Sequence, residues 1–334
     1  MAEQNMAEQG PIFIVGMNGS GTTMLADLLD NARDLYVFPR ETRMIPWLIR
    51  NVDRYGNLQK RANLATLLQA FCDLYAVRMV SRGDVPTVDA VREPSVYGVV
   101  DAVYRHLAAK EGKRRWVEKS PMNLQFMLPI AAEMPTAKFI HIYRDGRDVA
   151  QSNQRRWHKH PIWSIYRWVQ TVRQGRKDGS TLGPTRYLEV SYEALTEEPE
   201  ATMRRVSEFI DIPYGPELLR SSMPFVNTVY RNNIKEKSGT IVANSQKWKR
   251  HFSAAEVTRL EEIGGRLLAE LGYETANSAG EAVPSSLLRK YWRCADVVNQ
   301  GILVLQRYGF KRSTPRSMME RFTEGVRYIA MQRH

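Results

Sequence analysis

The sequence has little cysteine and no long apolar run. Its 334 residues include only Cys72 and Cys294, which are too few and too far apart for a disulfide framework or a cysteine-based zinc site. No stretch of about 18 consecutive apolar residues occurs, and the first ten residues lack the basic and apolar segments of a secretory signal peptide. We therefore expect a cytoplasmic protein without a transmembrane span.

Histidine is scarce, and acidic residues are outnumbered by basic ones. Six histidines are scattered along the chain, and His158 and His160, two residues apart, do not share a helix face, so no metal site is predicted. The net charge of +12 suits a nucleic acid, an anionic membrane surface or a polyanionic small ligand. No nucleic-acid-binding module is recognisable, so we expect no specific nucleic-acid partner.

A glycine-rich loop follows a short apolar segment near the N-terminus. Residues 11–15 (PIFIV) are typical of a buried parallel strand, residues 16–23 read GMNGSGTT, and apolar residues then recur at helical spacing. This order of strand, loop and helix points backbone N–H groups and the positive helix end at an anion. Thr22 occupies the position of the lysine of nucleoside triphosphatases, which favours a 5′-phosphate group of lower charge than a triphosphate.

Later segments repeat the alternation of strand and helix. Residues 137–143 and 185–190 are typical of strands, and a turn at 144–146 leads into a helix over 147–157. The pattern predicts an α/β fold, with a P-loop-like parallel sheet flanked by helices and a ligand beyond the carboxyl ends of the strands. Further helices are expected near residues 60–80, 95–111, 123–133, 163–176, 199–210 and 254–271.

The last sixty residues differ in composition from the rest. Residues 274–286 are rich in Ala, Asn, Ser, Gly and Pro and are predicted to form a linker, and residues 287–334 form a basic, aromatic and helical C-terminal extension. The amphipathic extension has two interpretations. It packs against the core or a second subunit in a homodimer, or it makes a peripheral contact with an anionic membrane.

An ordered series of motifs resembles the PAPS-dependent sulfotransferases and looks most like their tyrosylprotein branch. PAPS is 3′-phosphoadenosine 5′-phosphosulfate, and PAP is its product. The motifs are Ser20-Gly-Thr-Thr23, Arg40-Glu-Thr-Arg43 with Ile45-Pro46, Glu118-Lys-Ser-Pro121, Arg144-Asp-Gly-Arg147 with Ser152 and Arg156, Tyr192-Glu193, and Lys247-Trp-Lys-Arg-His-Phe-Ser253. The resemblance implies a sulfotransferase domain over residues 11–273.

The resemblance also implies a donor site that contains no metal. The implied contacts to the 5′-phosphosulfate are the loop residues Asn18, Gly19, Ser20, Gly21, Thr22 and Thr23. The implied 3′-phosphate site consists of Arg144, Ser152 and Arg156, with further cofactor contacts from Tyr192 and Lys247. The spacing agrees with this assignment, because residues four apart on one helix face can converge on one anion.

The resemblance implies that three residues take part in catalysis of the transfer. Glu41 matches the catalytic base of the tyrosylprotein branch, since the acceptor hydroxyl must lose its proton. Lys119 matches a lysine near the leaving group, and Arg43 is expected to position the acceptor or orient the base. Taken singly, Glu41 is more typical of a surface ion pair with Arg40 or Arg43. The alternative interpretation of Lys119 is a surface lysine at the end of a strand, beside Glu118.

One position departs from the family pattern. Family loops carry an arginine or lysine before the serine, where this chain has Gly19. The preferred hypothesis is sulfuryl transfer from PAPS to a hydroxyl of a peptide tyrosine, glycan, glycolipid or phenolic metabolite. The alternatives are a PAP-binding or PAPS-binding protein with weakened catalysis, and a P-loop kinase that acts on a small molecule.

Overall fold

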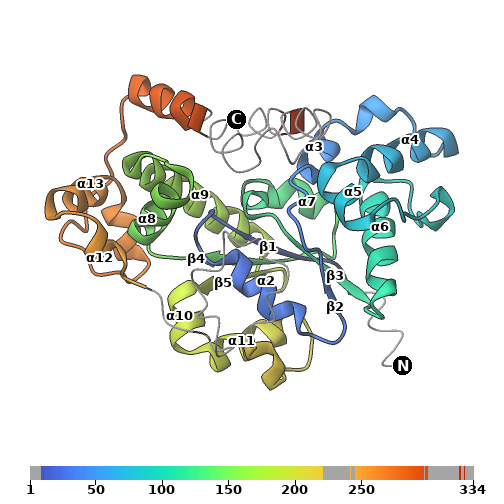
Figure 1. Ribbon diagram of the computed structural model, residues 1–334, viewed down its shortest axis with the longest axis horizontal. Coiled ribbons are helices and arrows are strands. Elements are labelled where there is room, and N and C mark those ends of the chain that lie inside the picture. Colours follow the sequence, from blue (N-terminus) through green and yellow to red (C-terminus); the bar gives the residue numbers. More distant parts are fainter. Residues whose placement is uncertain are drawn as a thin grey trace, which may run out of the picture.

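Five parallel strands form one sheet in the order β2-β3-β1-β4-β5 (Figure 1). The computed structural model describes residues 9–220, 241, 245–296, 298–299, 323–324 and 327. The strands are β1 (Ile12–Gly16), β2 (Leu35–Val37), β3 (Arg115–Lys119), β4 (Lys138–Tyr143) and β5 (Tyr187–Ser191). The predicted α/β class with a parallel sheet is confirmed, and β1 lies at its centre.

Alternate residues of β1 pack into two different apolar clusters, one on each face of the sheet. Phe13 and Val15 belong to one buried cluster, and Ile12 and Ile14 belong to another on the opposite face of the sheet. The first face is covered by α3 (Ile45–Arg50), α4 (Arg61–Cys72), α5 (Tyr75–Ser81), α6 (Val96–Lys110) and α7 (Met127–Glu133). The second is covered by α2 (Thr22–Asp30), α10 (Tyr192–Glu197) and α11 (Pro199–Phe209).

A third apolar cluster joins the helices that follow β4. Its helices are α8 (Gly146–Trp157), α9 (Pro161–Leu182), α12 (Trp248–His251) and α13 (Ala254–Glu270), which lie together at one end of the molecule in Figure 1. Trp168 of α9 is fully buried in this cluster. The short 3-10 helices are η1 (Val52–Tyr55), η2 (Val88–Ala90), η3 (Pro121–Phe126) and η4 (Pro216–Leu219).

Two strands and one helix break were not predicted from the sequence. β2 has only three residues, and β3 has three charged residues among its five, which hides the apolar pattern of a buried strand. The helix expected over 60–80 is divided into α4 and α5, which meet at 83°. No single helix among the described residues is long and apolar enough to span a membrane, whereas this bent pair passes by length and composition only.

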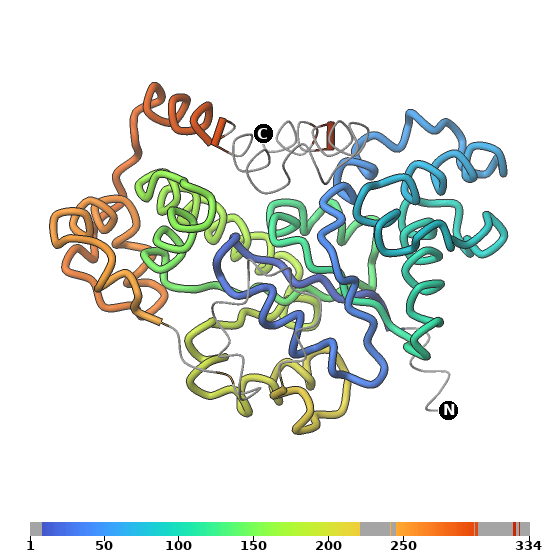
Figure 2. Tube along the Cα trace, viewed as in Figure 1, coloured from blue at the N-terminus to red at the C-terminus, as the bar shows by residue number. Residues whose placement is uncertain are grey.

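The described part of the C-terminal extension is helical and packs on the core. Residues 286–296 form a helix beside α8 and α9 (Figure 2). Trp292 is buried there, with its ring 4.9 Å from the ring of His160, and the indole N–H of Trp163 donates to Asp296. Ahead of this helix, the carbonyl of Gly280 accepts from the backbone N–H of Arg266 in α13. Most of the predicted extension, including residues 300–322, lies outside the described residues.

Candidate active site

The glycine loop between β1 and α2 has the backbone geometry of an anion-binding loop. Gly19 and Gly21 have φ angles of 98° and 100°, a left-handed conformation that favours glycine. A Cβ atom at Gly21 would also lie 2.4 Å from the ring of Tyr192. No side chain caps the start of α2, so its first N–H groups remain available to an anion.

A buried hydroxyl in the loop lacks a partner. Ser20 is fully buried, and its Oγ atom makes no hydrogen bond within the part of the chain that the structure describes. An unsatisfied buried hydroxyl is unfavourable unless a ligand or water completes it. This atom therefore fits a loop that receives phosphate oxygens.

The loop position that departs from the family pattern packs against α8. A Cβ atom at Gly19 would lie 3.4 Å from the Oγ of Ser152, and Arg144 donates to the Gly19 carbonyl at 3.5 Å. Because Gly19 adopts a left-handed conformation, a lysine or arginine at this position would be strained. Gly19, which replaces the basic residue of the family pattern, therefore occupies a position where the backbone conformation favours glycine.

The turn between β4 and α8 places a buried arginine beside the loop. Asp145 begins α8, where its carboxylate accepts from the N–H of Arg147 at 2.8 Å. The guanidinium of Arg144 lies 3.1 Å from the carboxylate of Asp148 and 4.3 Å from the ring centre of Tyr192. The sequence-predicted residues Arg144 and Tyr192 therefore lie together at the loop.

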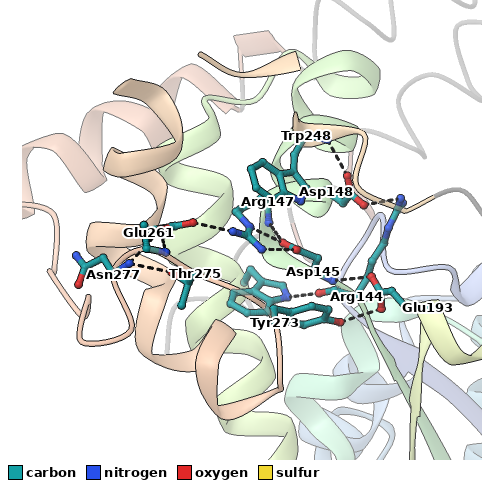
Figure 3. A network of polar contacts seen from close by, with 12 residues as sticks. Arg144, Asp145, Arg147, Asp148, Glu193, Trp248, Glu261, Tyr273, Thr275 and Asn277 are labelled. Carbon is teal, nitrogen blue, oxygen red and sulfur yellow. Dashed lines mark hydrogen bonds and ion pairs between the residues drawn. The ribbon is translucent and has the colours of Figure 1, made fainter. Parts of the chain in front are cut away.

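Asp148 also connects α8 to a distant part of the chain. Its carboxylate accepts from the backbone N–H of Trp248 at 3.0 Å, and the guanidinium of Arg147 lies 3.9 Å from the Trp248 ring centre (Figure 3). Burial raises the pKa of Asp148, while Arg144 opposes that rise. These contacts bring Lys247 to the same end of the sheet as Arg144. The sequence analysis assigned no role to Asp148.

Four basic residues near α8 form what we call the cation cluster: Arg144, Arg155, Arg156 and Lys247. Burial lowers the pKa of Lys247, and the charges of Arg155, Arg144 and Arg156 lower it further. Mutual repulsion of this kind is relieved when an anion binds among the cations. The structure thus brings together three predicted residues and adds Arg155, which the motifs did not single out.

Glu41 and Lys119 meet at the carboxyl end of β3. The Nζ atom of Lys119 lies 2.8 Å from Oε1 of Glu41, and both side chains are less than one-fifth exposed. Lys119 is paired in register with Ile14 of β1, two residues before Gly16 and the glycine loop. Two residues predicted from separate motifs are therefore in contact, next to the loop.

Arg43 completes the charge balance around Glu41. Its guanidinium donates to Oε2 of Glu41 from Nε at 2.9 Å and from Nη2 at 2.5 Å. Burial favours the protonated carboxyl, but the charges of Lys119 and Arg43 outweigh it and lower the pKa of Glu41 to about 2. The side chain of Arg40 instead lies over the ring of Tyr75. Of the two ion pairs considered from the sequence, the structure shows the one with Arg43.

No group of three or more His, Cys, Asp or Glu side chains is placed to hold a metal ion within the described ranges. The chemistry that the site offers is instead that of N–H groups, hydroxyls and cations around an anion. Beside them lies one carboxylate that is held in its ionised form.

Comparisons with known proteins agree on one family. The sulfotransferase family model matches residues 11–216. The chain is 24% identical over 296 residues to protein-tyrosine sulfotransferase A of Caenorhabditis elegans, which covers 84% of this chain and 71% of that protein. It is 32% identical over 117 residues to carbohydrate sulfotransferase 2 of Mus musculus, which covers 31% of this chain and 20% of that protein.

A solved structure gives the same assignment for the fold. The sulfotransferase domain of the Synechococcus PCC 7002 olefin synthase superposes with a TM-score of 0.53 at 21% identity, covering 80% of this chain and 97% of that domain. The family model spans more than half of the chain, from the strand before the glycine loop to the end of α11 and beyond. The prediction made from the motifs is confirmed: the chain belongs to the sulfotransferase family and has the sulfotransferase fold.

Proposed function

We propose that this sulfotransferase moves the sulfuryl group of PAPS to a hydroxyl of its acceptor. The observation that carries the proposal is the 2.8 Å contact between Glu41 and Lys119 beside the glycine loop. In this proposal Glu41 is the proton acceptor and Lys119 the cation, and both lie at the carboxyl end of the strands, beside the glycine loop. In-line transfer needs both groups, on the attacking and the leaving side of the sulfur.

The donor-side residues fit a ligand with phosphates at both ends of a nucleoside. The buried hydroxyl of Ser20 and the uncapped N–H groups of α2 suit the 5′-phosphosulfate. The cation cluster suits the 3′-phosphate, with the hydroxyl of Ser152 on the same helix. Tyr192 packs on the loop between these two places, where it helps to hold the loop and Arg144.

The transfer step assigns one role to each charged side chain. Glu41 accepts the proton of the acceptor hydroxyl while the new bond between oxygen and sulfur forms. The ammonium of Lys119 stabilises the charge that develops on the bridging oxygen as the bond between that oxygen and sulfur breaks. The products are PAP and the sulfated acceptor, and Glu41 then returns its proton to solvent. Arg43 orients the carboxylate of Glu41 throughout.

The ion pair gives this mechanism an order of events. A carboxyl with a pKa of about 2 is a weak base while Lys119 and Arg43 both contact it. When Lys119 turns towards the leaving group, Glu41 loses one of its two cations and its pKa rises. We propose that the base becomes effective only after the donor has bound.

The acceptor is proposed to be a hydroxyl of the tyrosine or carbohydrate kind. The two relatives described above are named as a protein-tyrosine sulfotransferase and a carbohydrate sulfotransferase. One mechanism serves both acceptor classes, because each acceptor loses a hydroxyl proton. A panel of tyrosine peptides, oligosaccharides and simple phenols, tested with labelled PAPS, would separate them. Membership of the sulfotransferase family makes the P-loop kinase the weaker alternative.

Gly19 supports a second candidate function, a PAP-binding protein with weak transfer activity. The family's loop base is absent, and the left-handed backbone at this position disfavours its replacement by a longer side chain. Loss of one donor to the transition state lowers rates by roughly 10²–10³-fold without affecting ground-state binding to the same degree. This candidate predicts PAP binding with little or no turnover of any acceptor.

The deciding experiment combines binding with turnover. A ligand at a hundred times its Kd adds about 2.7 kcal/mol to the free energy of unfolding, which appears as a rise in Tm. We expect such a rise with PAP and none with AMP or with ATP and magnesium, together with sulfated product from PAPS. PAP binding without turnover favours the second candidate, and a larger rise with magnesium ATP contradicts both.

A further inference from the structure

Glu118 is a fully buried carboxylate next to Lys119 in β3. Neighbouring residues of a strand point to opposite faces, so the two side chains enter different surroundings. Lys119 reaches Glu41, whereas Glu118 accepts three hydrogen bonds inside the protein. No lysine, arginine or histidine lies within ion-pair distance of Glu118 among the described residues. A buried carboxylate without a paired cation is unfavourable, so the hydrogen bonds must hold it.

The three hydrogen bonds connect β3 to the segment that carries the proposed base. Oε1 of Glu118 accepts from the backbone N–H of Thr42 at 3.4 Å and from the hydroxyl of Ser120 at 2.5 Å. Oε2 accepts from the side-chain amide of Asn123 at 2.9 Å. The Ser120 oxygen in turn accepts from the N–H of Arg43 at 3.2 Å. The two residues that follow Glu41 are therefore held, directly or through Ser120, by one carboxylate.

The backbone of the same segment needs such support. Arg43 has a φ angle of 59°, a left-handed conformation that is unfavourable for a residue with a side chain. The Thr42 side chain is buried and forms a hydrogen bond with the hydroxyl of Tyr104 in α6. A strained turn stays in place only when its surroundings fix it, and Glu118 supplies one fixing contact directly and a second through Ser120.

We propose that Glu118 is a positioning residue, whose carboxylate fixes the two backbone segments that carry Glu41 and Lys119 and so places the pair at the site. Lys119 follows Glu118 in the chain, and Glu41 precedes the N–H group of Thr42 that Glu118 binds, so one buried group fixes both sides of the pair. The inference rests on the proposed function of Glu41 and Lys119. Glu118 belongs to one of the motifs that resemble the family, but that resemblance implied a role only for Lys119.

The ionisation of Glu118 gives the proposal a signature in pH. Burial raises its pKa to about 7, opposed by the bonds from Ser120 and Thr42, raised further by Glu41 and lowered by Lys119. A protonated carboxyl has an O–H donor in place of one acceptor, so one of the three bonds must break or reverse. The groups around Glu118 are Lys119 at the end of β3, Ser120 directly after it, Glu41, Thr42 and Arg43 in the segment that precedes α3, Asn123 in η3 and Tyr104 in α6.

The test compares Glu118→Gln with Glu133→Gln in the full chain. Glu133 also accepts from a backbone N–H, that of Tyr97, but lies outside the site. The first measurement is the rate at which a water-soluble succinimidyl ester acylates Lys119, followed by mass spectrometry. We expect slow acylation in the wild type and in Glu133→Gln, because the amine is paired and 14% exposed. We expect faster acylation in Glu118→Gln, approaching the rate in Glu41→Gln.

The second measurement is sulfuryl transfer as a function of pH. Misplacement of a reacting group by about 1 Å lowers rates by roughly 10²-fold, so we expect kcat of Glu118→Gln to fall on that order while KM for PAPS is unchanged. The wild-type kcat should fall below pH 7 as Glu118 becomes protonated, and the variant should lack this limb. If Glu118→Gln does not fold, Ser120→Ala removes the contact to Arg43 and keeps the carboxylate.

The two measurements separate the failure of this inference from the failure of the proposed function. Wild-type acylation rates at Lys119 in both Glu118→Gln and Ser120→Ala would overturn the positioning role, whatever the activity. Faster acylation in the variants, together with a wild-type protein that neither binds PAP nor transfers sulfate, would retain the positioning of the pair but reject the transfer function. A kcat that falls without a change in acylation or in the pH profile also overturns the inference.

Discussion

The two sides of the site, which we propose to serve donor binding and transfer, differ in their balance of charge. On the donor side the members of the cation cluster lie close enough to repel one another. Repulsion from Arg155 and Arg144 adds to burial in lowering the pKa of Lys247. On the transfer side Lys119 and Arg43 both contact Glu41, whose pKa is lowered to about 2. In the first region the carboxylate of Asp148 offsets only part of the positive charge of the four basic side chains, so the region is suited to bind an anion. In the second region the carboxylate of Glu41 is paired with two cations, so Glu41 and Lys119 must separate before they react.

Removal of the proposed base should have the largest effect. Glu41→Gln keeps the shape of the side chain but cannot accept the proton, and general bases contribute roughly 10²–10⁴-fold to rates. We expect kcat to fall by that factor while the Tm increase with PAP stays as in the wild type, because the donor side is untouched. Stopped or continuous assays with labelled PAPS give kcat. A variant with wild-type kcat would remove Glu41 from the mechanism.

Removal of the shared cation should have the next largest effect. Lys119→Met takes away the group that we propose stabilises the leaving oxygen, and we expect this loss to lower kcat by roughly 10²–10³-fold. It also leaves Glu41 with Arg43 alone, so the pKa of Glu41 should rise above about 2. Carbon-13 NMR of labelled glutamate, assigned with Glu41→Gln, measures that pKa directly.

The same ion pair predicts a change in acid stability. A carboxyl whose folded-state pKa lies below its ordinary value of 4.5 stabilises the folded state above that value, and the contribution is lost as pH falls towards about 2. The loss of Tm between pH 5 and 3 should therefore be smaller in Lys119→Met than in the wild type. Equal losses in both proteins would show that the pair does not shift the titration of Glu41.

The sequence predicted the parts of the site better than their connections. The strand β1, the glycine loop and the helix α8 follow from local patterns, because glycine spacing and apolar periodicity are local properties. The strand β3 did not, because Arg115 and Glu118 are charged residues buried through long-range contacts that no local pattern records. For the same reason the contact between Glu41 and Lys119, 78 residues apart, became visible only in the folded chain.

A smaller effect is expected from one member of the cation cluster. Lys247→Ala removes a charge that we assign to the 3′-phosphate, and hydrogen bonds to charged groups contribute about 1.5–3 kcal/mol. The Kd for PAP should thus rise roughly tenfold to a hundredfold, with little change in kcat at saturating PAPS. Arg144→Ala is a poorer test, because it would leave the buried carboxylate of Asp148 without its cation. Titration calorimetry gives the Kd, and adenosine 5′-phosphosulfate, which lacks the 3′-phosphate, should bind both proteins equally.

The smallest predicted effect is a dependence of PAP affinity on pH. Burial and the neighbouring arginines lower the pKa of Lys247 from its usual 10.5, so the free protein loses this charge as pH rises through the lowered value. A bound phosphate favours the protonated amine, and PAP binding should therefore take up a proton and weaken as the solution becomes alkaline. The second pKa of a phosphate monoester lies near 6, so the ligand itself does not titrate in that range.

Calorimetry in two buffers with different ionisation enthalpies counts the protons taken up, and Lys247→Ala should abolish the alkaline uptake. Uptake that persists in the variant would move the titration to another group, and its absence from the wild type would place the phosphate away from Lys247.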